Sequence, residues 1–135
     1  MRHFEAWTPD CESDPLTYAI TGCAIDVHKV LGPGLRESAY EESLSYALHK
    51  EGLLFVRQAF LPAVYEEINL EKAYRPDLIV NKEVVVEIKT VKHLLPVHDS
   101  QLLTYLRFSK IQRGLLLNFQ VRRMISGVRR LVLTR

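Results

Sequence analysis

The segment 75–90, with the sequence RPDLIVNKEVVVEIKT, constrains the fold of this chain more than any other stretch. An apolar run at 78–80 and a triple valine at 84–86 flank the residues Asn-Lys-Glu at 81–83. This arrangement is typical of two β-strands joined by a tight turn. A hairpin of this kind brings the beginning of the first strand opposite the end of the second.

The hairpin carries charges where a buried strand normally has none. Successive side chains of a strand point to opposite faces, so Glu87 and Lys89 share one face with Val85. A buried charge is costly without a partner, and the predicted hairpin brings Asp77 beside Glu87. Two carboxylates next to a lysine form a site suited to a hard divalent cation. The alternative is that Glu87 and Lys89 belong to an ordinary solvated face of a half-exposed sheet.

Length and composition point to one globular domain. The chain has 135 residues, of which 47% are apolar and 25% charged, and a chain of this size can bury about two thirds of its unfolded surface. We expect a loose N-terminal arm over residues 1–14 and a single domain over 15–135. No apolar run approaches the ~20 residues of a membrane helix, which argues against a membrane protein.

Cysteine usage and the N-terminus bear on the compartment. The beginning of the chain lacks the apolar core of a signal peptide. Cys11 and Cys23 are the two cysteines, and they form neither a metal-binding spacing nor a disulfide framework. We therefore expect a reducing, cytoplasmic setting, with Cys23 as a buried thiol.

The charges are divided unevenly along the chain. All 16 acidic residues lie within residues 1–99, whereas residues 100–135 carry eight Lys or Arg and no acid. An all-basic segment is suited to a polyanion such as a nucleic acid. The alternative is that these arginines pair with the acidic first part of the chain in the folded protein.

Two helices are expected before the hairpin. Asp14 followed by Pro15 is a typical helix start, and apolar residues then recur at helical spacing up to Leu31. Gly32-Pro33-Gly34 ends this helix. A second helix is predicted from Arg36 to Lys50, with Gly52 after it.

The remaining elements complete an α/β pattern. A third helix is predicted from His98 or Asp99 to Ser109, after a loop at 94–97, and it places Gln101 and Tyr105 on one face. The succession strand, helix, strand that follows the hairpin favours a parallel crossover. The expected order is α-α-β-β-β-α-β-β, a mixed central sheet flanked by helices, with strands at 54–66, 71–80, 84–90, 115–119 and 128–133.

Five short motifs together identify a family. GLRESAY at 34–40 reads as G-x-x-E-x-x-Y, and YRPDLIV, VVVEIKT, PVHDSQLLTYL and GLLLNF follow in this order. On these motifs the chain resembles the GxxExxY protein family, a branch of the PD-(D/E)XK nuclease superfamily, and the resemblance covers residues 17–133. The resemblance implies a PD-(D/E)XK nuclease-like fold.

The resemblance also implies a set of metal ligands. Asp77 and Glu87 correspond to the acidic ligands of a Mg²⁺ or Mn²⁺ ion. The backbone carbonyl of Ile88 corresponds to a further ligand, and Glu37 to the helical acid near the metal.

Three more residues correspond to catalytic positions. Lys89 matches the lysine that orients the attacking water and stabilises developing charge. Gln101 and Tyr105 match a Q-x-x-x-Y motif that follows the E-x-K strand in RecB-like nucleases, where these residues support the site or touch the scissile phosphate.

Two functions are compatible with these observations. The first is a Mg²⁺-dependent nuclease that hydrolyses phosphodiester bonds, with DNA as the expected substrate. The second is a catalytically silent module that binds nucleic acid or protein on a nuclease-like scaffold, since fold alone does not fix function. The small size of the chain makes a homodimer or a partner protein plausible in either case.

Overall fold

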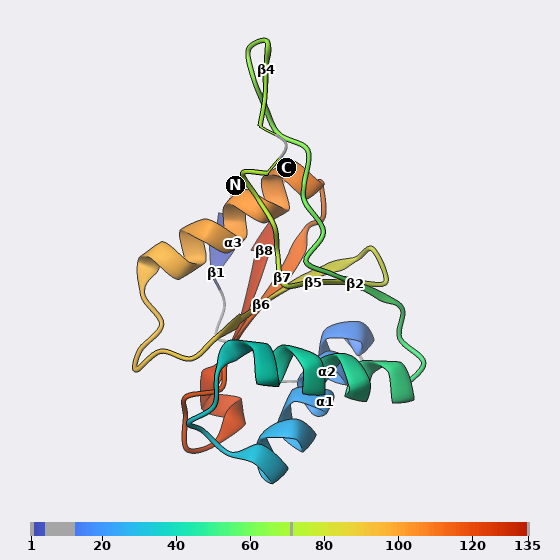
Figure 1. The fold of residues 1–135 in the computed structure, drawn as a ribbon, viewed down its shortest axis with the longest axis vertical. Coiled ribbons are helices and arrows are strands. Elements are labelled where there is room, and N and C mark those ends of the chain that lie inside the picture. Colours follow the sequence, from blue (N-terminus) through green and yellow to red (C-terminus); the bar gives the residue numbers. More distant parts are fainter. Residues whose placement is uncertain (1, 5–12, 71, 135) are drawn as a thin grey trace.

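The computed structural model describes residues 2–4, 13–70 and 72–134. Its centre is a six-stranded sheet in the order β1-β8-β7-β6-β5-β2 (Figure 1). Neighbouring strands are antiparallel except β6 and β7, which run parallel. The sheet is therefore mixed, as the sequence predicts.

The hairpin at 75–90 forms the middle of this sheet. Its strands are β5 (Leu78–Val80) and β6 (Val84–Lys89), and Val80 is paired with Val84. Asn81 and Lys82 in the turn both have positive φ, a conformation that Asn tolerates better than most residues. On the outer side, β2 (Phe55–Arg57) pairs with β5.

A helix connects the two parallel strands. Strand β6 is followed by α3 (Pro96–Ser109) and β7 (Arg113–Asn118), and β7 pairs with β6 in parallel. The predicted crossover is thus confirmed. The helix begins at Pro96, two residues before the predicted start, because a proline at the first helical position loses no hydrogen bond. Strand β8 (Val128–Leu133) has the predicted bounds and follows a short 3-10 helix, η1 (Met124–Gly127).

The first two helices also agree closely with the prediction. Helix α1 (Pro15–Leu31) is capped by Asp14, whose side chain accepts a hydrogen bond from the Thr17 amide, and Gly32 ends it. Helix α2 (Glu37–Lys50) begins one residue later than predicted.

Two hydrophobic cores lie on the two faces of the sheet. Side chains of α1 and α2 pack against Val84, Val86 and Ile88 on one face. Side chains of α3 pack against Val85 and the alternate positions of β7 on the other. Because strand side chains alternate, Glu87 and Lys89 lie on the same face as Val85, toward α3. The predicted face assignment of β6 is therefore confirmed.

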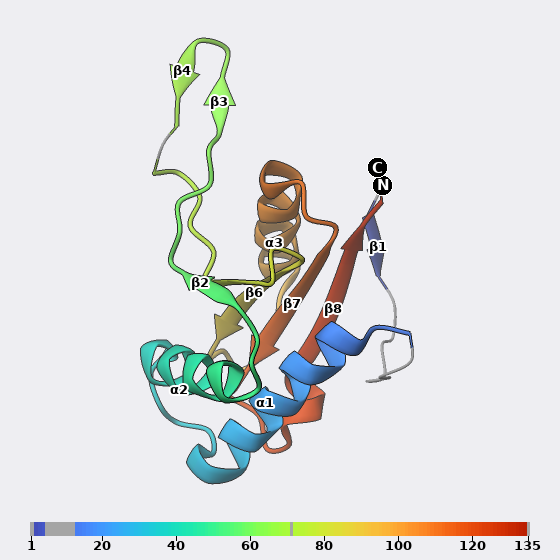
Figure 2. The ribbon, with the colours of Figure 1, turned by 90° about the vertical axis from the view of Figure 1, so that its right-hand side faces the viewer.

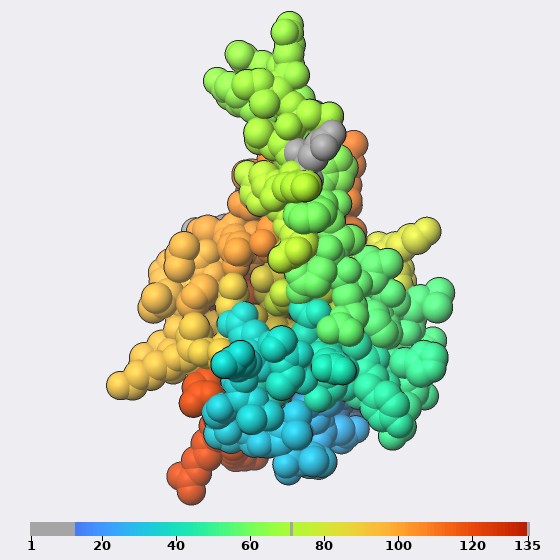
Figure 3. Space-filling view, in the orientation of Figure 1, coloured from blue at the N-terminus to red at the C-terminus, as the bar shows by residue number. Residues whose placement is uncertain are grey.

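The strand predicted at 54–66 is wrong in its second half. The chain leaves the sheet after Arg57, and residues 64–69 form a separate hairpin of β3 (Val64–Tyr65) and β4 (Ile68–Asn69). Positive φ at Gln58, together with Pro62, prevents one continuous strand. The hairpin stands away from the rest of the protein (Figures 2 and 3).

The predicted strand at 71–80 is correspondingly too long. Its regular part is β5, and the preceding residues contribute an isolated bridge between Leu61 and Tyr74. Because the chain leaves the sheet after Arg57 to form the β3–β4 hairpin, the segment before β5 lacks the neighbouring strand that a longer β5 would need.

The N-terminal arm differs from the expectation where it is described. Residues Arg2–Phe4 form strand β1, which pairs with the edge of β8, rather than part of a loose arm. Residues 5–12 lie outside the described residues. No helix in the described part of the chain combines the length and the hydropathy that crossing a bilayer requires.

Candidate active site

Asp77 and Glu87 lie side by side at the end of the central hairpin. The Asp77 amide donates a hydrogen bond of 2.7 Å to Glu87 Oε1, and the Ile88 amide donates one of 2.8 Å to Asp77 Oδ2. The register of β5 and β6 produces this arrangement, since Leu78 pairs with Val86 and the preceding residue therefore faces Glu87. Each carboxylate is thus held by the backbone of the strand that carries the other.

Both carboxyl groups hold a proton more tightly than usual. Burial, reinforced by the charge of Asp77, raises the pKa of Glu87 to about 8, against opposing effects of the Asp77 amide and Lys89. The pKa of Asp77 is also raised, chiefly by burial and in part by the charges of Glu41 and Glu37. A site that concentrates negative charge away from water in this way favours a cation.

Lys89 lies next to this pair and is held by α3. Its Nζ is 3.8 Å from Glu87 Oε2 and donates a 2.9 Å hydrogen bond to Gln101 Oε1. Gln101 Nε2 in turn donates to the Tyr105 hydroxyl at 3.2 Å. The helical spacing predicted to place Gln101 and Tyr105 on one face therefore aligns a chain of hydrogen bonds that ends on the lysine.

The carbonyl of Ile88 faces the same edge as Asp77. The Ile88 amide reaches Asp77 Oδ2, whereas the next carbonyl, that of Lys89, accepts a hydrogen bond from Phe119 after β7. The amide and carbonyl of one strand residue point to the same side, and those of its neighbour to the opposite side. The Ile88 carbonyl is therefore directed toward Asp77.

Glu37, the first residue of α2, lies close enough to influence the pair electrostatically. Its Oε2 accepts a 3.2 Å hydrogen bond from the amide of Thr90, just beyond β6. Its charge raises the pKa of both Asp77 and Glu87. Within the described residues, no three His, Cys, Asp or Glu side chains form a group that could hold a metal ion. The expected convergence of three acids is therefore limited here to two.

The donor set nevertheless fits a hard divalent cation. Two carboxylates and a carbonyl directed toward them are oxygen ligands, which Mg²⁺ and Mn²⁺ prefer. Mg²⁺ commonly retains several waters and needs only one or two protein carboxylates. Burial first, and the charge of Asp77 second, raise the pKa of Glu87 to about 8, so a bound cation would favour the ionised form of this group.

Sequence reasoning missed two residues of the site, Glu41 and Gln58. Gln58 Nε2 donates to Asp77 Oδ1 at 3.0 Å and also to Glu41 Oε1. Glu41 further accepts a 3.0 Å hydrogen bond from Arg57 Nε. Gln58 has a φ of 54°, and such left-handed non-glycine residues are concentrated at functional sites.

One of these two residues left a signal in the sequence. Glu41 follows Glu37 by four positions and so lies on the same side of α2, a spacing that could have identified it. Gln58 left no such signal, because its role depends on a chain reversal that the sequence around it does not predict.

Comparison with known proteins is consistent with this geometry. The model of one protein family, described as the PD-(D/E)XK nuclease superfamily, matches residues 14–131 and so covers the hairpin, all three helices and most of β8. No curated protein and no solved structure matches the chain significantly.

Proposed function

The chain belongs to the PD-(D/E)XK nuclease superfamily, and from this membership we propose that it is a Mg²⁺-dependent nuclease that hydrolyses phosphodiester bonds in DNA. Nucleases of this superfamily generally use divalent metal ions. The observation that carries the proposal is the pair Asp77 and Glu87, with Lys89 Nζ 3.8 Å from Glu87 Oε2. Mn²⁺ is the expected substitute for Mg²⁺.

Asp77, Glu87 and the Ile88 carbonyl are the residues proposed to hold the ion. When bound, a divalent cation supplies Lewis acidity toward the phosphate and activates a water molecule. Glu37 is proposed to enter this group by releasing the Thr90 amide, which is an exposed contact of 3.2 Å. The amides of Asp77 and Ile88 keep the two strand carboxylates in place.

Lys89 is proposed to act on the substrate. Its ammonium carries positive charge next to the metal ligands, where it can orient the attacking water and stabilise the negative charge that develops on the phosphate. Hydrolysis adds the water oxygen to phosphorus and breaks the bond to the leaving oxygen, which takes up a proton. Gln101 and Tyr105 fix the position of Lys89, because the hydrogen bond from Lys89 to Gln101 is 2.9 Å long.

Cleavage assays on purified protein test this proposal. Closed circular and linear DNA are incubated with Mg²⁺ or Mn²⁺, and with EDTA as the metal-free control. Wild type should cut, whereas Asp77→Ala and Lys89→Ala should not. Lys82→Ala, at the opposite end of the same hairpin, should cut like wild type. Equal background cleavage by wild type and both site variants would refute the proposed nuclease activity.

A second candidate is a silent binding module, and one observation favours it. The oxygens Glu87 Oε1, Asp77 Oδ2 and Glu37 Oε2 each accept a backbone hydrogen bond, so each of the three carboxyl groups has a protein partner without an ion. Such a module binds nucleic acid in EDTA as well as in Mg²⁺ and is insensitive to Asp77→Ala. A binding titration with and without EDTA distinguishes the two functions.

Two further inferences concern the setting of the protein. The buried free thiol of Cys23 suits a reducing compartment, the cytoplasm, and burial raises its pKa to about 11, which keeps it unreactive. A second copy or a partner protein is proposed to widen the surface that grips DNA, and sedimentation with and without DNA tests this.

A further inference from the structure

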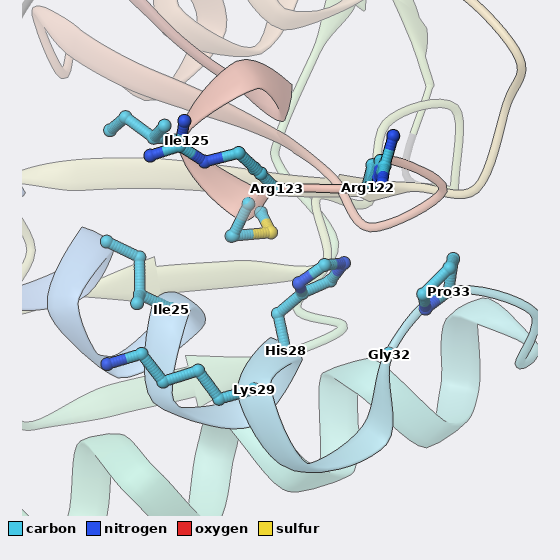
Figure 4. Close-up of a pocket in the computed structure, with 9 residues that line it drawn as sticks. Ile25, His28, Lys29, Gly32, Pro33, Arg122, Arg123 and Ile125 are labelled. Atoms are coloured by element: carbon cyan, nitrogen blue, oxygen red, sulfur yellow. The ribbon is translucent and has the colours of Figure 1, made fainter.

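A basic pocket lies between the end of α1 and the loop that follows β7. It has a volume of about 480 Å³. Figure 4 shows its two walls, one from α1 and the turn after it, the other from the loop leading into η1. The lining residues are Ile25, His28, Lys29, Gly32, Pro33 and the segment from Arg122 to Ile125.

Hydrogen bonds hold the two walls together. His28 is buried, and its Nε2 lies 2.8 Å from the carbonyl of Val121, to which it donates. The Gly34 amide donates a 3.0 Å hydrogen bond to Gln120 Oε1. A Cβ on Gly127 would come within 2.1 Å of the Asn118 carbonyl, so the loop packs tightly on itself. The pocket is therefore formed in advance of any ligand.

Exposed cations line the pocket. Lys29, Arg122 and Arg123 are exposed and have no ion pair within the described residues. The pocket lining contains no acidic residue. Positive charge without an internal counter-ion favours an external anion.

Other arginines of the basic C-terminal segment are already neutralised. Arg113 pairs with Asp14 and Glu83, and Arg129 pairs with Asp99 at 2.7 Å. The alternative considered for the basic segment, pairing with the acidic part of the chain, thus holds for these arginines. Arg122 and Arg123 are different, because in the loop after β7 neither forms an ion pair with an acid that the structure describes.

The pocket and the candidate active site share one end of the sheet. The loop with Arg122 and Arg123 follows β7, and Lys89 ends β6, the parallel neighbour. Asn118 links the two loops, since its side chain accepts from the Val91 amide and donates to the Val91 carbonyl. On the other wall, the turn at 32–34 leads directly to Glu37, whose carboxylate is bound to Thr90.

We propose that this pocket binds a backbone phosphate of the nucleic acid, flanking the phosphate at Asp77 and Glu87. The inference rests on the proposed nuclease function and adds a second contact point for the same strand. Arginine is suited to phosphate because its planar group donates two parallel hydrogen bonds. Ile25 and Met124 in the lining provide an apolar surface for the adjoining sugar.

Binding measured without metal tests the pocket separately from cleavage. The probe is a short fluorescein-labelled DNA duplex, titrated by anisotropy in EDTA at several salt concentrations. We compare the double variant Arg122→Gln/Arg123→Gln, called the pocket variant, with the control Lys82→Gln/Lys110→Gln. The control removes the same charge just before β6 and just after α3, at the ends of these elements opposite to the candidate active site. Thermal unfolding verifies that both double variants fold. If the Arg122→Gln/Arg123→Gln variant does not fold, Lys29→Gln, at an exposed helical position, replaces it.

The pocket variant should bind about tenfold more weakly than wild type. The slope of log K against log salt should fall in magnitude by about one for each phosphate that the variant no longer binds. The control should change neither the affinity nor the slope by a comparable amount.

Each contrary outcome has a distinct meaning. If the pocket variant binds with the affinity and slope of wild type, or if wild type binds no DNA, the pocket assignment is wrong. A preference of wild type for an acidic peptide such as polyglutamate over DNA also overturns it. If the pocket variant is weakened but wild type never cuts with Mg²⁺, the nuclease proposal fails while the phosphate site stands.

Discussion

At the scale of residues, the candidate site is dominated by two neighbouring carboxyl groups with little access to water. Glu87 is 4% exposed, and its closest cation, Lys89, is 3.8 Å away. The result is a pKa of about 8 for Glu87, well above the usual value of 4.5. In the absence of a divalent ion, ionisation of this group therefore opposes folding.

This shift predicts a specific dependence of stability on pH. Folded protein binds the Glu87 proton more tightly than unfolded protein, so the free energy of unfolding falls as the pH rises from 4.5 through about 8. Glu87→Gln removes the ionisation. In EDTA it should stabilise the protein at pH 8 by on the order of a few kcal/mol and have little effect below pH 4.5. Urea denaturation at both pH values measures the difference.

The control is Glu42→Gln, which alters an exposed carboxylate of α2. Parallel loss of stability with pH in wild type and Glu87→Gln would contradict the assignment. Addition of Mg²⁺ should stabilise wild type at pH 8 and stabilise Glu87→Gln less, because a ligand that binds only the folded state adds to its stability.

Gln101 provides a second test at the scale of residues. Gln101→Ala removes the acceptor of the 2.9 Å hydrogen bond from Lys89 and leaves the proposed metal ligands unchanged. We expect kcat to fall by roughly tenfold to a hundredfold, as for a misplaced catalytic group, with unchanged Mg²⁺ affinity by calorimetry. Thr104→Ala is the control on the same helix, since its hydroxyl bonds only the Ser100 carbonyl. Equal effects of the two substitutions would exclude a positioning role.

At the scale of elements, Asp14 joins the start of α1 to two strands. This buried carboxylate accepts from the Thr17 amide and pairs with Arg113 of β7 at 2.5 Å and Arg130 of β8 at 3.1 Å. The side chains of these arginines are only 25% and 14% exposed, so solvent cannot replace Asp14 fully. A helix cap and two ion pairs thus depend on one residue.

Asp14→Ala should therefore destabilise the protein by about 3 kcal/mol, since it removes a helix cap and one carboxylate partner of each of two partly buried guanidinium groups. The control is Glu83→Ala. Glu83 also contacts Arg113, at 3.2 Å, but its side chain is 58% exposed, and its loss should cost less than about 1 kcal/mol. Chemical denaturation compares the two, and similar losses would show that burial does not decide their contribution.

The hairpin β3–β4 is an appendage at the scale of the whole molecule. Val64, Tyr65 and Ile68 are each about 60% exposed, and among the described strands these two pair just with each other. An isolated two-stranded hairpin is at best marginally stable. The domain core therefore gains little from it.

Replacement of residues 64–69 by Asn-Gly should leave the free energy of unfolding within about 1 kcal/mol of wild type. The shortened loop can close because the Leu70 amide already donates to the Ala63 carbonyl at 2.8 Å. Leu61→Ala, which truncates a core residue at the base of the same segment, should cost about 2–4 kcal/mol. Thermal and urea unfolding check both, and a large loss in the loop replacement would show that the hairpin supports the core.

The elements that sequence reasoning predicted well are those encoded by neighbouring residues. The cap at Asp14, the stop at Gly32 and the turn at 81–83 each depend on residues only a few positions apart. The strand at 54–66 failed because positive φ at Gln58 has no local cause in the sequence. The contact between Gln58 and Asp77 that accompanies it joins residues far apart along the chain.

The sequence alone determined that Asp77 faces Glu87, because a short turn between two apolar strands leaves one register, and that Gln101 and Tyr105 share a helical face. Only the tertiary structure decided that Glu37 binds the Thr90 amide and that Arg113 and Arg129 are neutralised, whereas Arg122 and Arg123 form no ion pair among the residues described. Local hydrogen bonds and periodicity follow from a few adjacent residues. The charge around a side chain depends instead on which distant segments pack against it.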